Sequence, residues 1–245
     1  MASPQRRALI TGGGSGIGLA TARALAAAGA EVTVAGRRED KLKASGFPFI
    51  VMDVTDDGSV RAGVAAAGPV DIFVNNAGFA ATAPSLKTSR ALWDEMIALN
   101  LTSAFVCAQA VAPQMIARGW GRFIAIASTA SLKAYAYTGA YAAAKHGVLG
   151  WVRTLALEHA ATGVTFNTIC PGFTDTPLLS GALDRLAARS GGDIEAAKSA
   201  LAKVNPMARL VAPSEVAAAA VWLAGEGAAS VNGQAIVIDG GEMIA

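Results

Sequence analysis

Seven short apolar runs, separated by stretches with helical patterning, recur from one end of the chain to the other. The runs cover 8–10, 32–35, 47–52, 70–74, 123–127, 164–170 and 235–238. Strands that are apolar on both faces are typical of parallel sheets, because crossover helices cover the two faces. The pattern therefore predicts the α/β class, with a doubly wound, mostly parallel seven-stranded sheet and helices on both faces.

Helices are expected between these runs, at 17–28, 60–67, 89–118, 140–161 and 214–224. Ser214 and Glu215, directly after Pro213, form a typical start signal for the last of them. The chain has 245 residues, a length that one α/β domain accommodates. We therefore expect a single domain over 1–245.

Glycine and polar residues that could take part in binding or catalysis lie just beyond the apolar runs. They are Gly12, Arg37, Asp53, Asn75, Asn76, Ser128, Pro171 and Gly172. In open parallel sheets, ligands bind outside the carboxyl ends of the strands. These residues are therefore predicted to meet along one edge of the sheet.

The composition narrows the class of ligand. The chain carries 20 basic and 18 acidic residues, and this balance gives no electrostatic reason to expect nucleic acid or an anionic membrane as partner. Hydrophobic residues make up 53%, but the excess is mostly alanine rather than a continuous apolar stretch of the ~20 residues that a membrane span requires. No signal-type hydrophobic region follows the first residues, so we expect a cytoplasmic protein with a small ligand. Cys107 and Cys170 have no partners at metal-binding spacing; we expect buried free thiols and no metal site.

A glycine-rich string, TGGGSGIG, occupies residues 11–18, directly after the first predicted strand and before the first predicted helix. Glycine lets the backbone turn tightly and approach a pyrophosphate, whose charge then lies at the helix N-terminus. An ordinary glycine-rich turn is the alternative. The position between strand and helix favours dinucleotide binding.

Tyr141 and Lys145 lie four residues apart in a predicted helix, and Ser128 closes the fifth apolar run. Residues i and i+4 share a helix face, so the phenol and the ammonium can point into one site. A phenol that moves a proton, an ammonium that acidifies it and a hydroxyl that holds an oxygen are what a carbonyl reductase needs. Taken alone, the pair is more often a solvated helix pair, and a serine at this place is more often a cap or turn residue.

Six motifs together resemble the short-chain dehydrogenase/reductase family, and the likeness extends over essentially the whole chain. They are TGGGSGIG, NNAG at 75–78, Asn100, Ser128, YAAAK at 141–145 and Pro171-Gly172. The resemblance implies one Rossmann-type domain that carries both dinucleotide binding and catalysis, a nicotinamide cofactor, and a homotetramer built on the two long helices after the fourth and fifth strands. A cofactor-binding protein that kept the fold but lost the catalytic activity is the less favoured alternative.

The resemblance also assigns catalytic roles. Tyr141 is the general acid, whose pKa Lys145 and the oxidised nicotinamide are expected to lower from about 10. Lys145 also binds the nicotinamide ribose, Ser128 binds the substrate oxygen, and Asn100 anchors a water that links Lys145 to solvent. The cofactor set that follows from the glycine loop and the family pattern is Gly12, Ser15, Gly16, Ile17, Gly18, Arg37, Asp53, Val54, Asn76, Tyr141, Lys145, Thr174 and Thr176. Simple loop capping is the alternative for the two threonines.

NADP is the favoured cofactor and NAD the alternative. After the second run, Gly36 stands where an NAD enzyme presents an acid, and the guanidinium of Arg37 that follows suits a 2′-phosphate. Arg37 stacking on adenine, or Glu39 or Asp40 binding the ribose of NAD, are the alternatives. Only 38–46 separates the second and third runs, which leaves room for one or two helical turns and departs from the family pattern.

The substrate side is less constrained. The long connection at about 173–212 is expected to be a lid. The candidate lining residues are Ser128, Ala130, Leu132, Tyr135, Tyr137, Tyr141 and Phe173. The chain most resembles 3-oxoacyl thioester reductases, so a 3-oxoacyl-ACP or 3-oxoacyl-CoA is expected, with Lys133, Arg185 and Arg189 as candidate basic residues at the entrance. A dehydrogenase of another secondary alcohol is the alternative, because substrate choice depends on variable loops.

Overall fold

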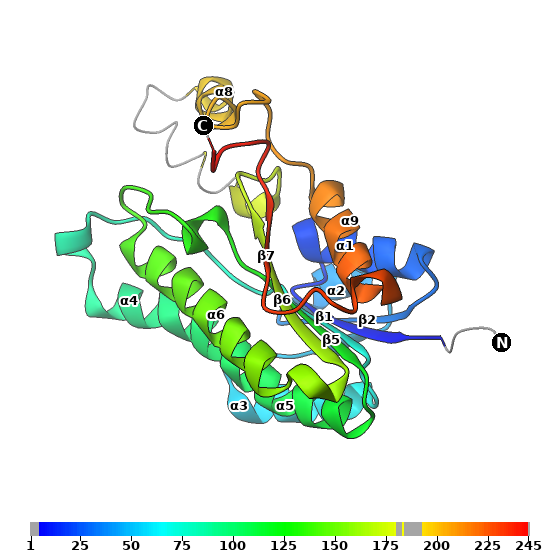
Figure 1. Ribbon diagram of the computed structural model, residues 1–245. Helices are drawn as coiled ribbons and strands as arrows, with labels where there is room; N and C mark the ends of the chain where they lie inside the picture. Colours follow the sequence, from blue (N-terminus) through cyan, green and yellow to red (C-terminus); the bar gives the residue numbers. More distant parts are fainter. Residues whose placement is uncertain (1–4, 180–182, 184–192, 245) are drawn as a thin grey trace.

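The computed structural model describes residues 5–179, 183 and 193–244. It contains a seven-stranded sheet in the order β3-β2-β1-β4-β5-β6-β7, and every neighbouring pair is parallel (Figure 1). The strands are β1 Arg7–Thr11, β2 Glu31–Gly36, β3 Phe49–Val51, β4 Ile72–Asn75, β5 Gly121–Ile126, β6 Val164–Pro171 and β7 Ala235–Ile238. Each strand overlaps its predicted run, which confirms the expected fold class.

Helices cover the sheet on both faces (Figure 1). α1 (Gly16–Ala27) packs against α9 (Pro213–Ala224) on one face, and α3 (Asp57–Ala67), α5 (Ser103–Ala117) and α6 (Gly139–Glu158) lie on the other. Successive strand residues point to opposite faces and so join different cores. In β5, for example, Phe123 belongs to the core under α5 and α6, and Ile124 to the core under α1 and α9.

The longest helical stretch, Arg90–Ala117, is interrupted by a change of period. The N-cap of α4 (Arg90–Ile97) is Ser89, whose Oγ accepts a hydrogen bond from Leu92 N (3.2 Å). A π-helical turn, η2 (Ala98–Thr102), then leads into α5. By length and composition the stretch is apolar enough to cross a membrane, which corrects the expectation that the chain has no such segment. More than half of its apolar window, 56%, is buried inside the protein, as in a core helix.

The remaining helices are short. α2 (Glu39–Ser45) has 7 residues, and Gly46 ends it with a φ of 80°. This agrees with the prediction that only one or two turns fit between β2 and β3. Further helical structure includes α8 (Ile194–Ala202) and the single turns η1 (Ser85–Lys87), η3 (Thr129–Ser131), η4 (Ala160–Thr162) and η5 (Glu226–Ala228). α9 begins at Pro213 rather than Ser214, and its N-cap, Ala212, donates its backbone N–H to Glu215 Oε2 (2.7 Å).

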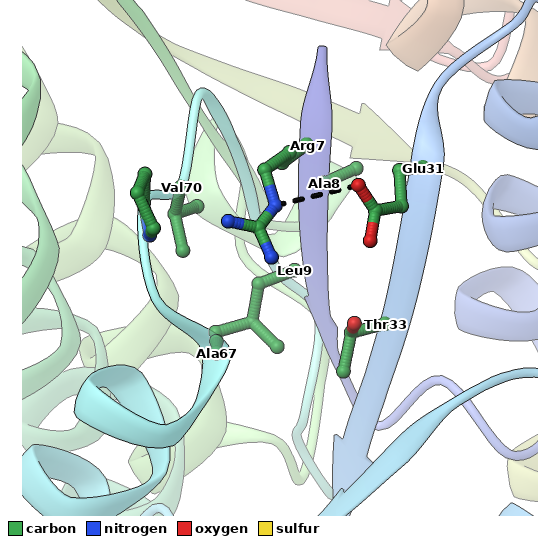
Figure 2. A pocket seen from close by; sticks show the side chains of 8 residues that line it. Arg7, Ala8, Leu9, Glu31, Thr33, Ala67 and Val70 are labelled. Carbon is green, nitrogen blue, oxygen red and sulfur yellow. Dashed lines mark ion pairs between the residues drawn. The ribbon is translucent and has the colours of Figure 1, made fainter. Parts of the chain in front are cut away.

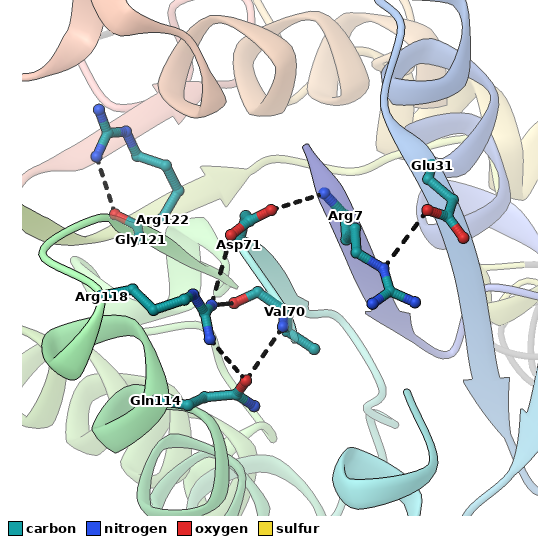
Figure 3. Close-up of polar contacts among 8 residues, drawn as sticks. All are labelled: Arg7, Glu31, Val70, Asp71, Gln114, Arg118, Gly121 and Arg122. Carbon is teal, nitrogen blue, oxygen red and sulfur yellow. Dashed lines mark hydrogen bonds and ion pairs between the residues drawn. The ribbon is translucent and has the colours of Figure 1, made fainter. Parts of the chain in front are cut away.

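Paired charges hold the amino ends of the strands together (Figure 3). Asp71 accepts hydrogen bonds from Arg7 N (3.0 Å) and from Arg118 Nη2 (3.4 Å). Gln114 accepts from Val70 N and from Arg118 Nη1. The crevice between Arg7, Glu31 and Val70 (Figure 2) has a volume of about 10 Å³, room for one water at most.

A larger hollow, of about 420 Å³, also lies at this edge. It is lined in part by Trp120, Arg122 and Glu226. The Trp120 ring lies 3.5 Å from Arg6 Cζ and 4.3 Å from Arg122 Cζ, and Glu226 accepts a hydrogen bond from Trp120 Nε1 (3.1 Å). The charges around this hollow are thus already paired with one another.

Candidate active site

Ser128 and Tyr141 meet beyond the carboxyl end of β5. Ser128 follows β5 in extended conformation, and its Oγ accepts a hydrogen bond from Ala130 N (3.1 Å), which fixes the turn η3. Tyr141 lies in the first turn of α6, and its hydroxyl is close enough to the Ser128 side chain for that neighbour to lower the Tyr141 pKa in part. Because Ser128 already accepts from a backbone amide, its own proton is available for a second oxygen. The structure therefore brings together the two predicted hydroxyls.

Lys145 lies one turn along α6 behind Tyr141. Lys145 is 6% exposed, and its Nζ donates a hydrogen bond to the Ile126 carbonyl oxygen (3.0 Å). The same Nζ lies 5.7 Å from the centroid of the Tyr141 ring. The i, i+4 spacing thus places the ammonium next to the phenol inside the protein, so the solvated-pair alternative is wrong.

Asn100 reaches the same place from the π-helical turn. Its Nδ2 donates to Phe79 O (2.9 Å) and Met96 O (3.1 Å), and its Oδ1 accepts from Phe79 N (3.3 Å). A Cβ on Gly78 would lie 2.9 Å from Asn100 Oδ1 and 3.7 Å from Lys145 Nζ. Asn100 and Lys145 therefore flank one glycine, and π-turns recur at functional sites of this kind.

Burial dominates the proton affinities of the site. It raises the pKa of Tyr141, although the neighbouring Ser128 side chain lowers that pKa in part. It lowers the pKa of Lys145 to about 8. The expected lowering of the Tyr141 pKa is therefore not produced by the protein alone, because loss of hydration disfavours the phenolate more than its neighbours favour it.

The glycine loop joins β1 to α1 with little room for side chains. Gly12 has a φ of +65° and donates its N–H to Ala35 O (2.7 Å). A Cβ on Gly18 would lie 2.4 Å from Gly12 O, and one on Gly12 would lie 2.8 Å from Asn76 Nδ2. Asn76 holds the loop, because its Nδ2 donates to Thr11 O (2.9 Å) and Gly12 O (3.3 Å).

The N-terminus of α1 is suited to an anion. Its N-cap, Ser15, is extended and its side chain makes no capping hydrogen bond in the described part of the chain. The first turn, which contains Gly16, Ile17 and Gly18, holds no acidic residue. Its backbone N–H groups are therefore available for a phosphate, which the helix dipole also favours. The strand order reverses here, between β1 and β4, where doubly wound folds bind dinucleotides.

Thr174 and Thr176 lie in the segment after β6, beside this loop. A Cβ on Gly16 would lie 3.3 Å from Thr176 Cγ2, so the segment packs against the glycine loop. The Thr174 hydroxyl donates to Gly172 O (3.0 Å), and the Thr176 hydroxyl donates to Thr174 O (3.3 Å). These bonds are of the loop-capping kind, yet they shape a segment that borders the predicted pyrophosphate site.

Arg37 and Asp53 follow β2 and β3 on the other side of the glycine loop. Arg37 Nη1 lies 3.9 Å from Asp53 Oδ2, and the Arg37 side chain is 62% exposed. Burial acts to raise the pKa of Asp53, but hydrogen bonds from Thr55 and the charge of Arg37 together lower it. Asp53 Oδ1 accepts from Thr55 N (2.9 Å), and Val54 is buried beside it. The contact between Arg37 and Asp53 is weak, because both charges are solvated.

The residues predicted to line the substrate pocket fall into two groups. Ala130 is buried, and the Tyr135 ring packs edge-on against Phe173 with centroids 5.9 Å apart. Tyr137, by contrast, is 60% exposed and has a φ of 68°, so most of its side chain lies in solvent rather than in a closed pocket. Arg185, Arg189 and the lid residues 180–182 and 184–192 lie outside the described part of the chain.

Lys133 is not free to meet a charged substrate. Its Nζ lies 3.0 Å from Glu242 Oε1, and that carboxylate is 1% exposed. Glu242 is a residue that sequence reasoning missed, because nothing local marks a glutamate near the end of the chain as buried. Thr11 was also missed; its Oγ1 accepts from Asn76 N and Ala77 N (both 3.0 Å). Cys107 and Cys170 are both buried and free, as predicted.

Comparison with known proteins agrees with this geometry. Residues 6–186 match the short chain dehydrogenase family, and the chain belongs to it. A D-beta-hydroxybutyrate dehydrogenase of Cupriavidus necator is 40% identical over 96% of this chain and 97% of its own length. The structure of levodione reductase has a TM-score of 0.94 and 33% identity, with 98% of each chain covered. A variant of actinorhodin polyketide ketoreductase with NADPH has a TM-score of 0.94 and 35% identity over all of both chains.

The protein is therefore an oxidoreductase of the short-chain dehydrogenase type, which acts on CH–OH and C=O groups with a nicotinamide cofactor. Its fold is the Rossmann-type doubly wound sheet of that family.

Proposed function

We propose that this enzyme reduces the ketone of a 3-oxoacyl thioester, carried by CoA or by an acyl carrier protein, with NADPH. The observation that carries the catalytic part is the approach of the Ser128 and Tyr141 side chains, with the buried Lys145 ammonium directly behind them. Thr129, which directly follows Ser128, connects this group to the Tyr135–Phe173 pair through its hydrogen bond with the Tyr135 hydroxyl.

In this proposal each side chain has one task. Ser128 donates a hydrogen bond to the substrate carbonyl oxygen and so orients the ketone. Tyr141 donates its proton to the same oxygen as negative charge develops on it. The nicotinamide, when bound, supplies the hydride. Lys145 keeps a positive charge near Tyr141 at neutral pH, because its pKa of about 8 leaves most molecules protonated. Asn100, fixed by three hydrogen bonds, holds the chain around Gly78 next to Lys145.

Tyr141 has the protonation state that reduction needs. Its phenol carries its proton at neutral pH and can donate it to the developing alkoxide. Burial raises the pKa of Tyr141, so the phenolate that oxidation of an alcohol needs is disfavoured until a further positive charge is bound. We therefore expect dehydrogenase activity to grow with pH.

NADPH is the proposed cofactor. The glycine loop and the N-terminus of α1 would hold the pyrophosphate, and Lys145 the nicotinamide ribose. Arg37, exposed and held only by the long contact to Asp53, follows β2, where a 2′-phosphate would need a cation. Glu39, one of the residues that would serve NAD instead, is already paired with Lys43 at 2.9 Å. The ketoreductase relative with NADPH supports the same choice.

We further propose that the chain works as one domain with a lid at about 173–212, as a homotetramer in the cytoplasm. Lys133 does not serve the thioester in this proposal, because Glu242 neutralises it. A second candidate is oxidation of a small secondary alcohol such as a 3-hydroxy acid. The 40% identity to a D-beta-hydroxybutyrate dehydrogenase favours it.

A panel of 3-oxoacyl thioesters, 3-hydroxy acids and simple ketones, run with NADPH and with NADH, tests these proposals together. We expect the highest kcat/KM for a 3-oxoacyl thioester with NADPH. A preference for NADH that Arg37→Ala leaves unchanged would contradict the role of Arg37. A preference for free 3-hydroxy acids would establish the second candidate.

A further inference from the structure

A buried carboxylate connects the end of the chain to the substrate side of the active site. Glu242, in the turn after β7, is 4% exposed. Its Oε1 accepts a hydrogen bond from the Tyr135 hydroxyl and pairs with Lys133 Nζ. The Tyr135 hydroxyl is also hydrogen-bonded to Thr129 Oγ1 (2.6 Å), and Thr129 directly follows Ser128. The catalytic role proposed for Ser128, Tyr141 and Lys145 leaves this network unused.

The turn that carries Glu242 is itself rigidly built. Asp239 Oδ1 accepts from Gly241 N (2.9 Å), and its Oδ2 accepts from Met243 N (2.8 Å). Gly240 has a φ of +64°, and a Cβ there would lie 2.0 Å from Asn205 Oδ1. The turn is therefore wedged against the segment that follows α8, and Glu242 has one fixed position from which to reach Tyr135.

Glu242 also approaches the backbone after β6. A Cβ on Gly172 would lie 3.0 Å from Glu242 Oε2, an oxygen that is buried without a hydrogen-bond partner among the described residues. Burying a polar oxygen without a hydrogen-bond partner costs stability. A residue that only stabilised the fold would gain more as an apolar side chain of similar size.

The ring that Glu242 fixes forms one wall of the predicted substrate pocket. Tyr135 packs edge-on against Phe173, the residue that begins the connection after Gly172. The energy of an edge-on aromatic pair depends on the relative orientation of its rings. The hydrogen bond at the Tyr135 hydroxyl therefore sets the orientation of the Tyr135 ring against Phe173.

We propose that Glu242 is a positioning residue that sets the affinity for the carbonyl substrate by holding Tyr135 against Phe173. The assignment rests on the proposed function, because that function makes Tyr135 and Phe173 the pocket walls. It places the C-terminal turn among the determinants of substrate choice, and it leaves proton transfer to Tyr141 and Ser128.

Four proteins test the proposal: the wild type, Glu242→Gln, Tyr135→Phe and the double variant. We expect Glu242→Gln to raise KM for the carbonyl substrate about tenfold, with kcat and KM for NADPH within about twofold of wild type, since a misaligned wall weakens binding by ~1.4 kcal/mol. In the Tyr135→Phe background the same substitution should change KM by less than about twofold, because the hydroxyl that transmits the effect is gone. Glu31→Gln, at the exposed start of β2 on the opposite edge of the sheet, is the matched control and should leave kcat and both KM values unchanged.

The outcomes separate the two levels of the proposal. An active wild type whose KM is unchanged by Glu242→Gln, or raised equally in both backgrounds, contradicts the role of Glu242 and leaves the proposed function intact. A wild type that turns over no carbonyl compound contradicts both. If Glu242→Gln unfolds, Tyr135→Phe alone decides: an unchanged KM for the carbonyl substrate refutes positioning through that hydroxyl.

Discussion

The two edges of the sheet use polar side chains in opposite ways. At the amino edge, Arg7, Asp71, Arg118 and Gln114 satisfy one another and the strand ends (Figure 3). At the carboxyl edge, Tyr141 is half-buried and Lys145 is buried, in surroundings that disfavour their charged forms. The same strands thus end in a stabilising network on one side and in an arrangement that costs stability on the other. Stability and chemistry are separated along the strand direction, so substitutions at the two edges should affect different measurements.

Tyr141→Phe should produce the largest effect, and on activity alone. The phenol is the only group in the proposal that gives a proton to the substrate, so kcat should fall at least ~10³-fold, within the range of general acid catalysis. Cofactor binding, followed by fluorescence titration with NADPH, should change little. Residual kcat above one tenth of wild type contradicts the assignment.

Asp71→Ala should have the opposite profile. It removes the acceptor for Arg7 N and for Arg118, so we expect the free energy of unfolding to fall by about 2–3 kcal/mol while kcat/KM stays within twofold. Urea unfolding together with steady-state kinetics checks both. Asp94→Ala is the matched control, because its pair with Arg90 is exposed to solvent and should contribute little to the free energy of unfolding.

Lys145→Met should stabilise the protein at neutral pH although it abolishes activity. Burial lowers the pKa of Lys145 from 10.5 to about 8, so folding at pH 7 carries the cost of a desolvated charge. With the lost bond to Ile126 O subtracted, we expect a gain of about 1–2 kcal/mol. In the unfolded chain Lys145 keeps its proton to a higher pH than in the folded protein, so the free energy of unfolding of the wild type rises between pH 8 and 10.5. The stabilisation by Lys145→Met relative to wild type therefore shrinks over that range. Unfolding of both proteins at pH 7 and pH 9 measures this, and an equal difference at both values contradicts it.

Glu215→Gln should have the smallest effect. Its hydrogen bonds with Arg209 and Ala212 N lower the pKa of Glu215 to about 2, and the side chain is 39% exposed. A carboxylate with a lowered folded pKa stabilises above its unfolded pKa of 4.5, and this contribution is lost as pH falls toward 2. With solvent screening, we expect less than about 1 kcal/mol at pH 7, and wild type and variant should converge at low pH in thermal melts.

The fold was predictable because its signals are local. Each parallel strand is an apolar run, and the glycine loop, Ser128 and the Tyr141–Lys145 spacing are read directly from neighbouring residues. The predictions that failed depend on contacts between residues that are far apart in the chain. The pairing of Lys133 with Glu242 joins residues far apart in the chain, and the burial of Tyr141 that raises its pKa depends on several elements. The 89–118 helix was predicted in full, but its change of period at η2 was not, since propensity does not distinguish an α from a π turn.

That π turn makes the length of one helix critical. A π turn holds one residue more than an α turn over nearly the same rotation, so removing a single residue from Ala98–Thr102 would convert the turn to regular α-helix. The buried face of α5, which includes Val106, Val111 and Met115, would stay toward the sheet. The bulge that carries Asn100 would be lost, and with it the hydrogen bonds to Phe79 O and Met96 O. A deletion in this turn is therefore expected to preserve the fold and to disturb the active site.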